Sequence, residues 1–489
     1  MSLIKKLAGQ TAVYGLSSIV GRLLNYLLVP LYTRIFSPEQ FGVVTELYAY
    51  VSFLIIILTY GLETTLFRFT HSEEKKEEVY STILITILTS TSLFIFLSVI
   101  LSPFITEGLG YESHPEYIYW FILIIAFDAA SSIPFAKLRE QNKAVKFVSF
   151  KLINIFTNIG FNLFFLVLSP IIYKQGGGFW FEIIDVIYNP EIGIGYIFIS
   201  NLISSIVTIL LLFPYFYPKA FTFNPVLFKS MMIYSMPLMV AGLAGMTNET
   251  ADRILIKHLL PADIALYQLG IYGACYKVAV LMTIFIQAFR FAAEPFFFAQ
   301  ASASNRGEIY AAVMHYFIIA GTLIFLSIML YIDKVQLFVG EQYREGIVIV
   351  PILLLANLFL GIFINLSIWY KLTGKTIYGA YLTGFGAIIT IVLNIILIPQ
   401  IGYLGAAWTT LICYTVLMLL SYILGQRNFY INYDVKAAGF YIIFAVFLYF
   451  LSTLNTIEHE GIKFFINSLG LLLFIVVLFL KERRKKVLI

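Results

Sequence analysis

Charged side chains occur inside stretches of the chain that otherwise consist of apolar residues. Asp252 and Arg253 stand in one such stretch, and Lys277 stands in the next. A charge near the centre of a bilayer costs about 2.5–3.5 kcal/mol on insertion scales, so it normally faces a bundle interior or a wet cavity. If these stretches span a membrane, their charges mark a polar path, and we expect something charged to pass along it.

The composition is that of an integral membrane protein. Of 489 residues, 60% are hydrophobic and 12% are charged, and the mean hydropathy is +0.90, well above that of soluble domains. A spanning helix needs roughly 20 mostly apolar residues. This length predicts an all-α polytopic membrane protein with about fourteen transmembrane helices, at residues 7–36, 41–69, 80–105, 117–138, 147–168, 192–213, 228–260, 264–298, 309–331, 347–372, 377–398, 403–425, 435–454 and 462–480.

The basic residues are concentrated on one side of this layout. Lys5, Lys75, Lys143 and the tail 481–486 fall on the side that also holds both termini. The opposite connections contain only Lys174, Lys334, Arg344 and Lys463. Short cytoplasmic loops are enriched in Lys and Arg, so both termini are predicted to be cytoplasmic. This rule also accounts for the net charge of +5, and we expect no nucleic-acid partner.

A weak internal repeat organises the first twelve predicted helices. Five pairs of positions recur in the same order: Arg34 and Pro38 with Lys257 and Pro261, Arg68 with Arg290, and Lys143 and Asn162 with Lys375 and Asn394. The repeat predicts two six-helix lobes of the same orientation, 1–213 and 228–426, followed by an appended helix pair, 435–480. Parallel repeats of this kind are a transporter architecture whose site lies between the halves near the midplane.

Several short motifs carry a family resemblance. They are LYTRIFSPEQFG from Leu31 to Gly42, Asp252-Arg253-Ile-Leu, Leu266-Tyr267, Ala274-Cys-Tyr-Lys-Val278, and Glu294-Pro295. With the layout of six, six and two helices, they resemble the polysaccharide-transport branch of the multidrug, oligosaccharidyl-lipid and polysaccharide exporter superfamily, which contains flippases of O-antigen and other repeat units. The resemblance covers essentially the whole chain.

The resemblance implies a function and a location. Members of this branch move undecaprenyl-pyrophosphate-linked oligosaccharides from the cytoplasmic to the periplasmic leaflet of the bacterial inner membrane. We therefore expect a lipid-linked oligosaccharide as substrate, contact with membrane lipids, and membrane proteins of polysaccharide assembly, including those of lipopolysaccharide, as candidate partners. The resemblance implies a transporter and not an enzyme.

Three basic residues are the predicted contacts of the pyrophosphate headgroup. A pyrophosphate needs fixed cations to replace its hydration, and Arg binds phosphate bidentately whereas Lys acts as a point charge. Arg22 and Lys277 fall near the middle of predicted helices one and eight, and Arg253 falls past the middle of helix seven. These helices are expected to line a cationic central cleft that works by alternating access.

A structural interpretation competes with this one. Glu249 stands one turn before Arg253, and Asp252 adjoins it, so either acid can form an ion pair with Arg253 that only stabilises the bundle. Glu249 and Asp252 are therefore support residues in this hypothesis. Arg68 and Arg290 lie near cytoplasmic helix ends and are predicted anchors or gate residues.

Acidic residues allow a second function. Glu63 and Asp128 are candidate ligands of a coupling Na⁺ or proton, and Asp128 is followed by Pro134, which frees a backbone carbonyl. Hydrogen bonding of Asp128 to nearby hydroxyl groups is an equally good explanation. If acidic side chains bind the coupling ion or the substrate, the chain is an ion-coupled antiporter of drugs or organic cations from the same superfamily.

No enzyme signature is found in the sequence. The five histidines have no metal-ligand spacing, and the glycine run 176–178 is not followed by the Lys of a phosphate-binding loop. We expect no metal and no cofactor apart from a coupling ion. A membrane glycan polymerase or ligase is the weakest alternative, because the longest predicted outer connection, 169–191, contains few acidic residues.

Overall fold

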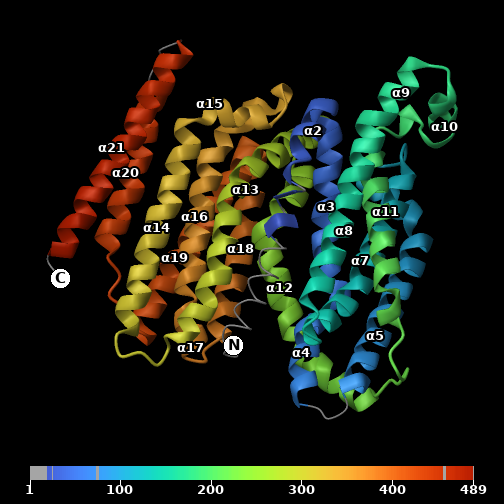
Figure 1. Ribbon diagram of the computed structural model, residues 1–489, viewed down its shortest axis with the longest axis horizontal. Helices are drawn as coiled ribbons and strands as arrows, with labels where there is room; N and C mark the ends of the chain where they lie inside the picture. The colour runs from blue at the N-terminus through green and yellow to red at the C-terminus, as the bar shows by residue number, and fades with distance from the viewer. Residues whose placement is uncertain (1–18, 22, 25, 73–75, 455–458, 488–489) are drawn as a thin grey trace. The chain divides into compact units, whose positions relative to one another are not determined.

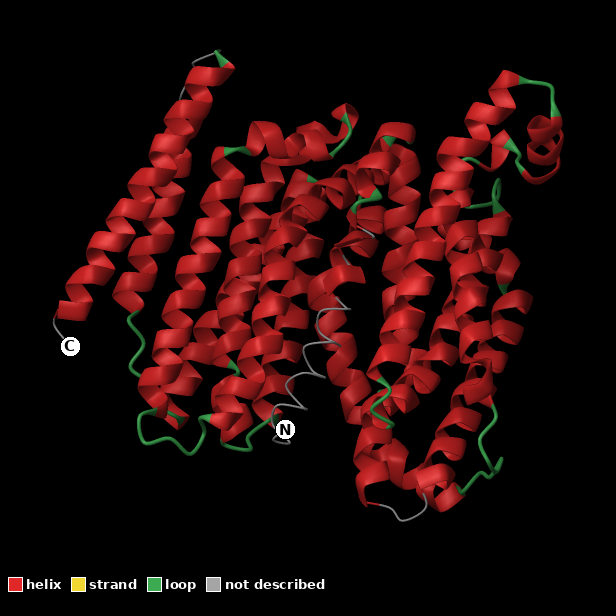
Figure 2. Ribbon diagram, viewed as in Figure 1, coloured by secondary structure: helices red, strands yellow, loops and turns green. Residues whose placement is uncertain are grey.

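The computed structural model describes residues 19–21, 23–24, 26–72, 76–454 and 459–487. Every regular element in these ranges is helical (Figure 2). Thirteen helical segments of the described chain are long and apolar enough to cross a membrane, which confirms an all-α polytopic membrane protein. Most of the predicted span 7–36 lies outside the described residues.

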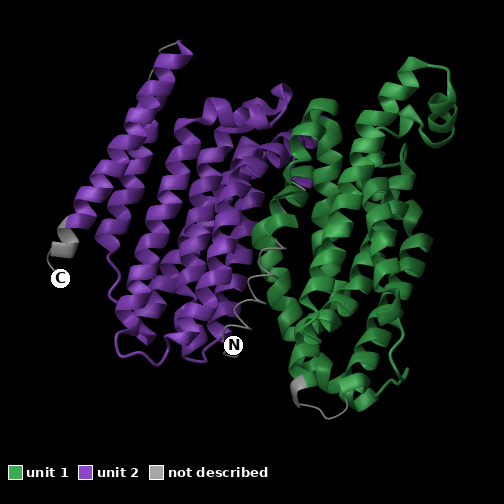
Figure 3. Ribbon diagram, viewed as in Figure 1, with its two compact units in different colours: residues 1–257 green, residues 258–489 purple. Residues whose placement is uncertain are grey.

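The chain forms two compact units, Met1–Lys257 and His258–Ile489 (Figure 3). The first contains α2 (Val29–Ile35), α3 (Pro38–Thr59), α4 (Leu62–Ser72), α5 (Lys76–Ile100), α6 (Ser102–Leu109), α7 (Pro115–Glu140), α8 (Ala144–Leu163), α9 (Ser169–Gln175), α10 (Phe179–Ile187), α11 (Gly195–Leu212) and α12 (Pro225–Leu259). Helix α12 thus belongs almost wholly to the first unit, although the sequence places residue 228 onward in a second lobe. The two-lobe repeat stays a prediction.

The second unit is also built from long helices. It contains α13 (Ala262–Ala299), α14 (Arg306–Leu330), α15 (Ile332–Val335), α16 (Val350–Leu366), α17 (Ile368–Leu372), α18 (Ile377–Ile401), α19 (Tyr403–Asn428), α20 (Val435–Thr453) and α21 (Glu460–Val487) (Figure 1). Short π- and 3₁₀-helical segments join several of them, at Phe164–Leu168, Pro190–Ile192, Phe213–Phe216, Gln336–Phe338 and Glu341–Ile349.

Helix α7 forms the centre of the first unit. It contacts α3, α4, α5, α8 and α11. Its apolar residues surround the helix axis, and Phe121, Ile124, Ile133 and Leu138 on different sides of it are all buried. A helix that is apolar all round is expected in a core. Polar residues on such a helix therefore face neighbouring helices.

The second predicted span is broken into α3 and α4. Ser37 caps α3 by accepting from the Gln40 backbone N–H, and the Gln40 side chain accepts from the Ser37 N–H, so the capping box lies within the LYTRIFSPEQFG motif. Helix α3 ends where Tyr60 and Gly61 take left-handed backbone angles, with φ of 51° and 70°. A Cβ on Gly61 would lie 3.2 Å from Cβ of Leu238 in α12, so glycine permits both the turn and the close approach.

In the second unit, α18 and α19 form a tight hairpin. Gly402 has a φ of 62° between the two helices. A Cβ on Gly405 would lie 2.6 Å from the Leu397 backbone, so only glycine fits there. Helix α19 packs against α16, and α16 packs against α13 and α14.

The appended pair consists of α20 and α21. A carboxylate near the C-terminal end of α21 attaches this pair to α14. Glu482 of α21 accepts a hydrogen bond from the Tyr441 hydroxyl at 2.6 Å, and its Oε1 lies 2.8 Å from Nε2 of His315 in α14. The His315 and Glu482 side chains are 13% and 19% exposed. One partly buried carboxylate therefore joins three helices.

The other end of α21 is attached through more exposed groups. Lys463 Nζ lies 2.5 Å from Asp333, and Lys334 Nζ lies 2.8 Å from Glu460. The Asn467 side chain also donates to the Leu330 carbonyl at 2.6 Å. Polar bonds therefore hold one end of α21 against His315 and Tyr441, and the other end against the end of α14 and the start of α15.

We expect Glu482→Ala to lower the free energy of unfolding by about 1–2 kcal/mol, because it removes two hydrogen bonds to a partly buried carboxylate. Glu460→Ala is the matched control, since its side chain is 83% exposed and surface ion pairs contribute about 0–1 kcal/mol. Thermal unfolding of both purified variants in one detergent measures the difference. Equal shifts in the two midpoints would contradict a special role for Glu482.

Candidate functional site

The first unit contains a polar cavity within its membrane-spanning helices. Its volume is about 420 Å³, within the range of about 300–1,000 Å³ that is usual for small-molecule sites. We call it the N-terminal cavity. It is lined by Ile55, Glu63, Asp128, Ser131, Ser132, Phe135, Arg139, Phe147, Lys151, Asn154, Asn201 and Thr208.

The lining residues follow helical periodicity. On α7 they are Asp128, Ser131, Ser132, Phe135 and Arg139, which are spaced by three or four residues and so share one face. Helix α8 contributes positions 147, 151 and 154, spaced by four and three residues, and α11 contributes positions 201 and 208, which are seven residues apart and so lie on the same face. Three helices therefore turn their polar faces toward one space.

An ion pair between α4 and α7 lies at one end of the cavity. The Arg139 guanidinium pairs with the Glu63 carboxylate. The same guanidinium lies 5.0 Å from the centre of the Phe67 ring and 5.9 Å from that of Phe147, distances that permit cation–π attraction. Because Glu63 directly follows the break at Tyr60 and Gly61, the break sets the position of this carboxylate.

A second pair of opposite charges lies near the middle of α7. Asp128 Oδ1 accepts a hydrogen bond from the Ser205 hydroxyl of α11 at 2.8 Å. Lys151 of α8 lines the same cavity as this carboxylate, and its ammonium lies 4.1 Å from the centre of the Phe135 ring. Lys151 is also exposed. The hydrogen bond from Ser205 agrees with the hydroxyl partner that the sequence allows for Asp128.

Amide and hydroxyl groups complete the lining. The Asn154 amide nitrogen donates to Thr208 Oγ1 at 2.8 Å and to the Ser204 carbonyl at 3.1 Å. The Asn201 amide nitrogen donates to the Tyr48 hydroxyl at 2.6 Å. Ser131 is only 4% exposed, and its hydroxyl has no hydrogen-bond partner within the described part of the chain.

The structure places Arg253 beside acidic residues of its own helix. Its Nη1 lies 3.3 Å from Asp252 Oδ1 and donates to the backbone carbonyl of Glu249 at 2.6 Å. Asp252 is buried and Glu249 is exposed. The carboxylate that pairs with Arg253 is therefore Asp252, while Glu249 contributes its backbone.

The other two predicted headgroup contacts belong to other parts of the chain than Arg253. Lys277 lies near the middle of α13 in the second unit, and it is exposed between the buried residues Tyr276 and Val278. Arg22 lies outside the described residues. The grouping of Arg22, Arg253 and Lys277 in one cleft stays a prediction.

The two predicted gate residues are both exposed. Arg68 lies 4.1 Å from the centre of the Tyr234 ring in α12. Arg290 Nε lies 3.5 Å from Glu294, which also pairs with Lys371. Each arginine thus has a local contact within its own unit.

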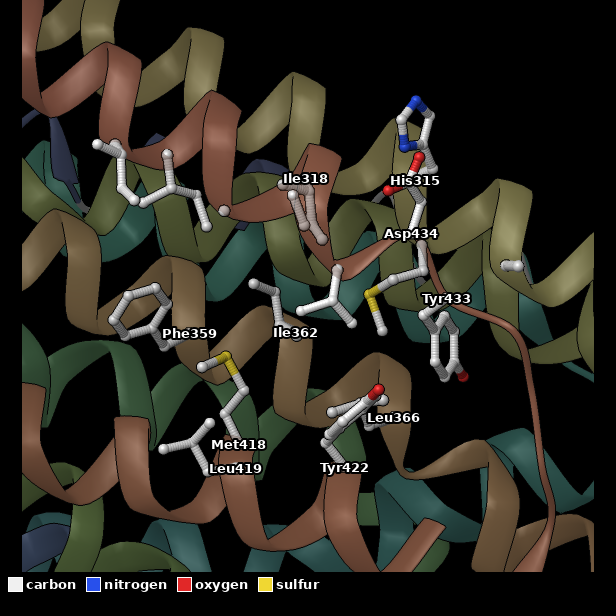
Figure 4. Close-up of a pocket in the computed structure, with 17 residues that line it drawn as sticks. His315, Ile318, Phe359, Ile362, Leu366, Met418, Leu419, Tyr422, Tyr433 and Asp434 are labelled. Carbon is white, nitrogen blue, oxygen red and sulfur yellow. The ribbon is translucent and has the colours of Figure 1, made fainter. Parts of the chain in front are cut away.

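The second unit contains a cavity of a different kind. Its volume is about 360 Å³, and it lies between α14, α16, α19 and α20 (Figure 4). Ile318, Phe359, Ile362 and Met418 are among the apolar side chains that form its walls, and His315, Tyr433 and Asp434 lie toward one end. Apolar walls inside a membrane protein suit lipid chains and offer few groups that bind polar ligands. We therefore take the N-terminal cavity as the candidate site.

Two charged residues of the N-terminal cavity were not predicted from the sequence. Arg139 and Lys151 line the cavity but are not among the predicted site residues. Their spacing from Asp128 and from Phe147 was the available signal, because a polar face on an apolar helix indicates a cavity or a partner. The described residues contain no group of three or more His, Cys, Asp or Glu side chains placed to hold a metal ion.

A family match and the fold of solved structures both relate this chain to known proteins. Residues 7–300 match the family described as "Polysaccharide biosynthesis protein". No curated protein matches the chain. Among solved structures, "Lipid II flippase MurJ, inward closed conformation" is 15% identical with a TM-score of 0.65, over 96% of this chain and 98% of that one.

Multidrug transporters also share the fold. "Inward-facing conformation of a multidrug resistance MATE family transporter of the MOP superfamily" is 14% identical with a TM-score of 0.65, over 84% of this chain and 94% of that one. "Crystal structure of MATE in the straight conformation" is 12% identical with a TM-score of 0.55, over 86% and 95%. At such identities the likeness establishes the fold alone.

Proposed function

Because the chain belongs to the polysaccharide biosynthesis protein family, we propose that it moves undecaprenyl-pyrophosphate-linked oligosaccharide repeat units from the cytoplasmic to the periplasmic leaflet. The observation that carries the proposal is the family match across residues 7–300, which include the whole N-terminal cavity. A flippase must offer a wet, polar path for a glycan while the lipid tail stays in hydrocarbon, and this cavity is polar at the depth of the membrane.

The proposed mechanism is alternating access with cations at the headgroup. Arg22, Arg253 and Lys277 are the proposed contacts of the pyrophosphate, which binds Arg through paired hydrogen bonds and Lys through charge. Asp252 orients Arg253 in this proposal, because its carboxylate lies 3.3 Å from the guanidinium. The loaded headgroup then favours the state in which the protein closes on it. No chemical step is needed, so the protein acts as a transporter and not as an enzyme.

Deleting the gene tests the function. We expect an undecaprenyl-pyrophosphate-linked glycan to accumulate, which mass spectrometry of extracted lipids detects, and we expect wild-type protein to remove it. Unchanged lipids together with new sensitivity to cationic dyes would instead favour an ion-coupled antiporter. For that alternative, Glu63 and Asp128 are the proposed coupling-ion ligands.

The proposed location is the bacterial inner membrane with both termini in the cytoplasm. Lys143 and Glu112 flank opposite ends of α7, so they must lie on opposite sides of the bilayer. We expect Glu112→Cys to react with an impermeant thiol reagent in intact cells, and Lys143→Cys only after permeabilisation. Both native cysteines, Cys275 and Cys413, are buried and give little background. Strong labelling at position 143 in intact cells would reverse the orientation.

A further inference from the structure

We propose that the N-terminal cavity binds uncharged sugar residues of the transported glycan and so contributes to selection of the cargo. This inference rests on the proposed function, and it assigns the cavity a role separate from that of the headgroup cations. It follows from the charge balance of the cavity, from its hydrogen-bonding groups and from its shape.

The cavity is electrically balanced. Its lining contains two carboxylates, Glu63 and Asp128, and two cations, Arg139 and Lys151. Glu63 is paired with Arg139, and Asp128 and Lys151, of opposite formal charge, line the same cavity. A lone cation entering the cavity would meet two positive side chains, and a phosphate would meet two negative ones, so the balance favours a neutral polar ligand over either ion.

The hydrogen-bonding groups point to a ligand with hydroxyl groups. Ser131 is buried and its hydroxyl has no partner in the described structure, although a buried polar group without a partner normally destabilises a fold. Asn154 uses its amide nitrogen toward Thr208 and Ser204, which leaves its carbonyl oxygen oriented as an acceptor. Sugar hydroxyl groups both donate and accept, so they can satisfy groups of both kinds at once.

The shape of the cavity suits an extended ligand. Asp128 lies near the middle of α7 and Arg139 near its end, so the lined face extends over about 16 Å at 1.5 Å per residue. Phe135 and Phe147 form an apolar wall in which the ring centres are 5.4 Å apart. Apolar walls with a few placed polar groups are typical of small-molecule sites, and a pyranose ring offers C–H faces to the wall and hydroxyl edges to the polar groups.

The test measures binding to the full-length protein in lipid nanodiscs. The probe is the water-soluble oligosaccharide released by mild acid from the lipid-linked glycan that accumulates after gene deletion. Ser131→Ala removes one hydroxyl and Ser132→Leu fills part of the cavity. The matched control is Ser200→Ala on α11, because Ser200 is buried, bonds only to the Tyr196 carbonyl of its own helix in the described structure, and does not line the cavity.

We expect Ser131→Ala to weaken oligosaccharide binding about fivefold and Ser132→Leu at least about tenfold. Ser200→Ala should leave binding unchanged, and binding of inorganic pyrophosphate should be unchanged in all three variants. Ser131→Ala should not lower the unfolding temperature, since it removes a hydroxyl that has no partner within the described residues. A purely structural role for Ser131 would instead leave oligosaccharide binding unchanged and lower the unfolding temperature.

The outcomes separate this inference from the proposed function. Absence of any accumulated lipid-linked glycan would contradict the flippase and, with it, a site for the transported glycan. Accumulation of the glycan, together with equal oligosaccharide binding by wild type and both cavity variants, would overturn the sugar site alone. Binding of Na⁺ that Ser132→Leu abolishes, without oligosaccharide binding, would assign the cavity to a coupling cation and also overturn it.

Discussion

Replacing Lys277 with alanine is expected to reduce export of the lipid-linked oligosaccharide at least about tenfold while the amount of folded protein stays normal. Hydrogen bonds to charged groups contribute about 1.5–3 kcal/mol, which corresponds to roughly ten- to hundredfold in binding. The side chain is exposed near the middle of α13, so its removal leaves no cavity in the core. Mass spectrometry of lipid-linked glycan in complemented deletion cells measures the loss.

Two variants of the same helix control this experiment. Lys277→Arg keeps the charge and should retain part of the activity. Arg290→Ala removes an exposed cation near the end of α13 and should have a smaller effect, because its partner Glu294 also pairs with Lys371. Full complementation by Lys277→Ala at normal expression would defeat the cationic-cleft mechanism and favour the antiporter.

The second large effect concerns the charge balance of the N-terminal cavity. We expect Asp128→Ala to lower the free energy of unfolding by about 1–3 kcal/mol, because it leaves Lys151 without its acidic neighbour and Ser205 without its acceptor. Lys151→Met should be destabilising for the complementary reason. The double variant should be less destabilised than the sum of the two single ones, since it removes both charges together.

Thermal unfolding of the wild type, the two single variants and the double variant in one detergent gives the coupling energy between Asp128 and Lys151. Lys143→Met is the matched control, because its ammonium lies 5.5 Å from the centre of the Tyr215 ring and does not line the cavity. Lys143→Met should show no coupling to Asp128→Ala. If the Asp128 and Lys151 changes in the free energy of unfolding are strictly additive, the two charges do not interact.

The sequence by itself determined the class of this protein. Length, apolar runs and sparse charge predict an all-α polytopic membrane protein, and the described helices confirm it. These properties can be read locally, because each spanning helix satisfies its own backbone hydrogen bonds and must be apolar over a fixed length. The short motifs identified the polysaccharide-transport branch, and the family match over residues 7–300 confirms that resemblance.

The sequence also selected individual charged residues, but it selected them by their depth in a helix. Glu63 and Asp128 were chosen in this way, and both line the N-terminal cavity. Arg139 and Lys151 are absent from the predicted site, and Arg139 lies in the last turn of its helix, where a basic residue resembles a topology signal. Depth along one helix says nothing about the face that a neighbouring helix covers.

Only the tertiary structure decided which polar groups meet. Glu63 reaches Arg139 because α3 and α4 are separated by the left-handed turn at Tyr60 and Gly61. Asp128 meets Ser205 because α11 packs against α7, 77 residues further along the chain. Such pairings depend on the packing of several helices at once, and no spacing within one segment contains that information. The balance of charge that favours a neutral ligand therefore emerges only when the helices are assembled.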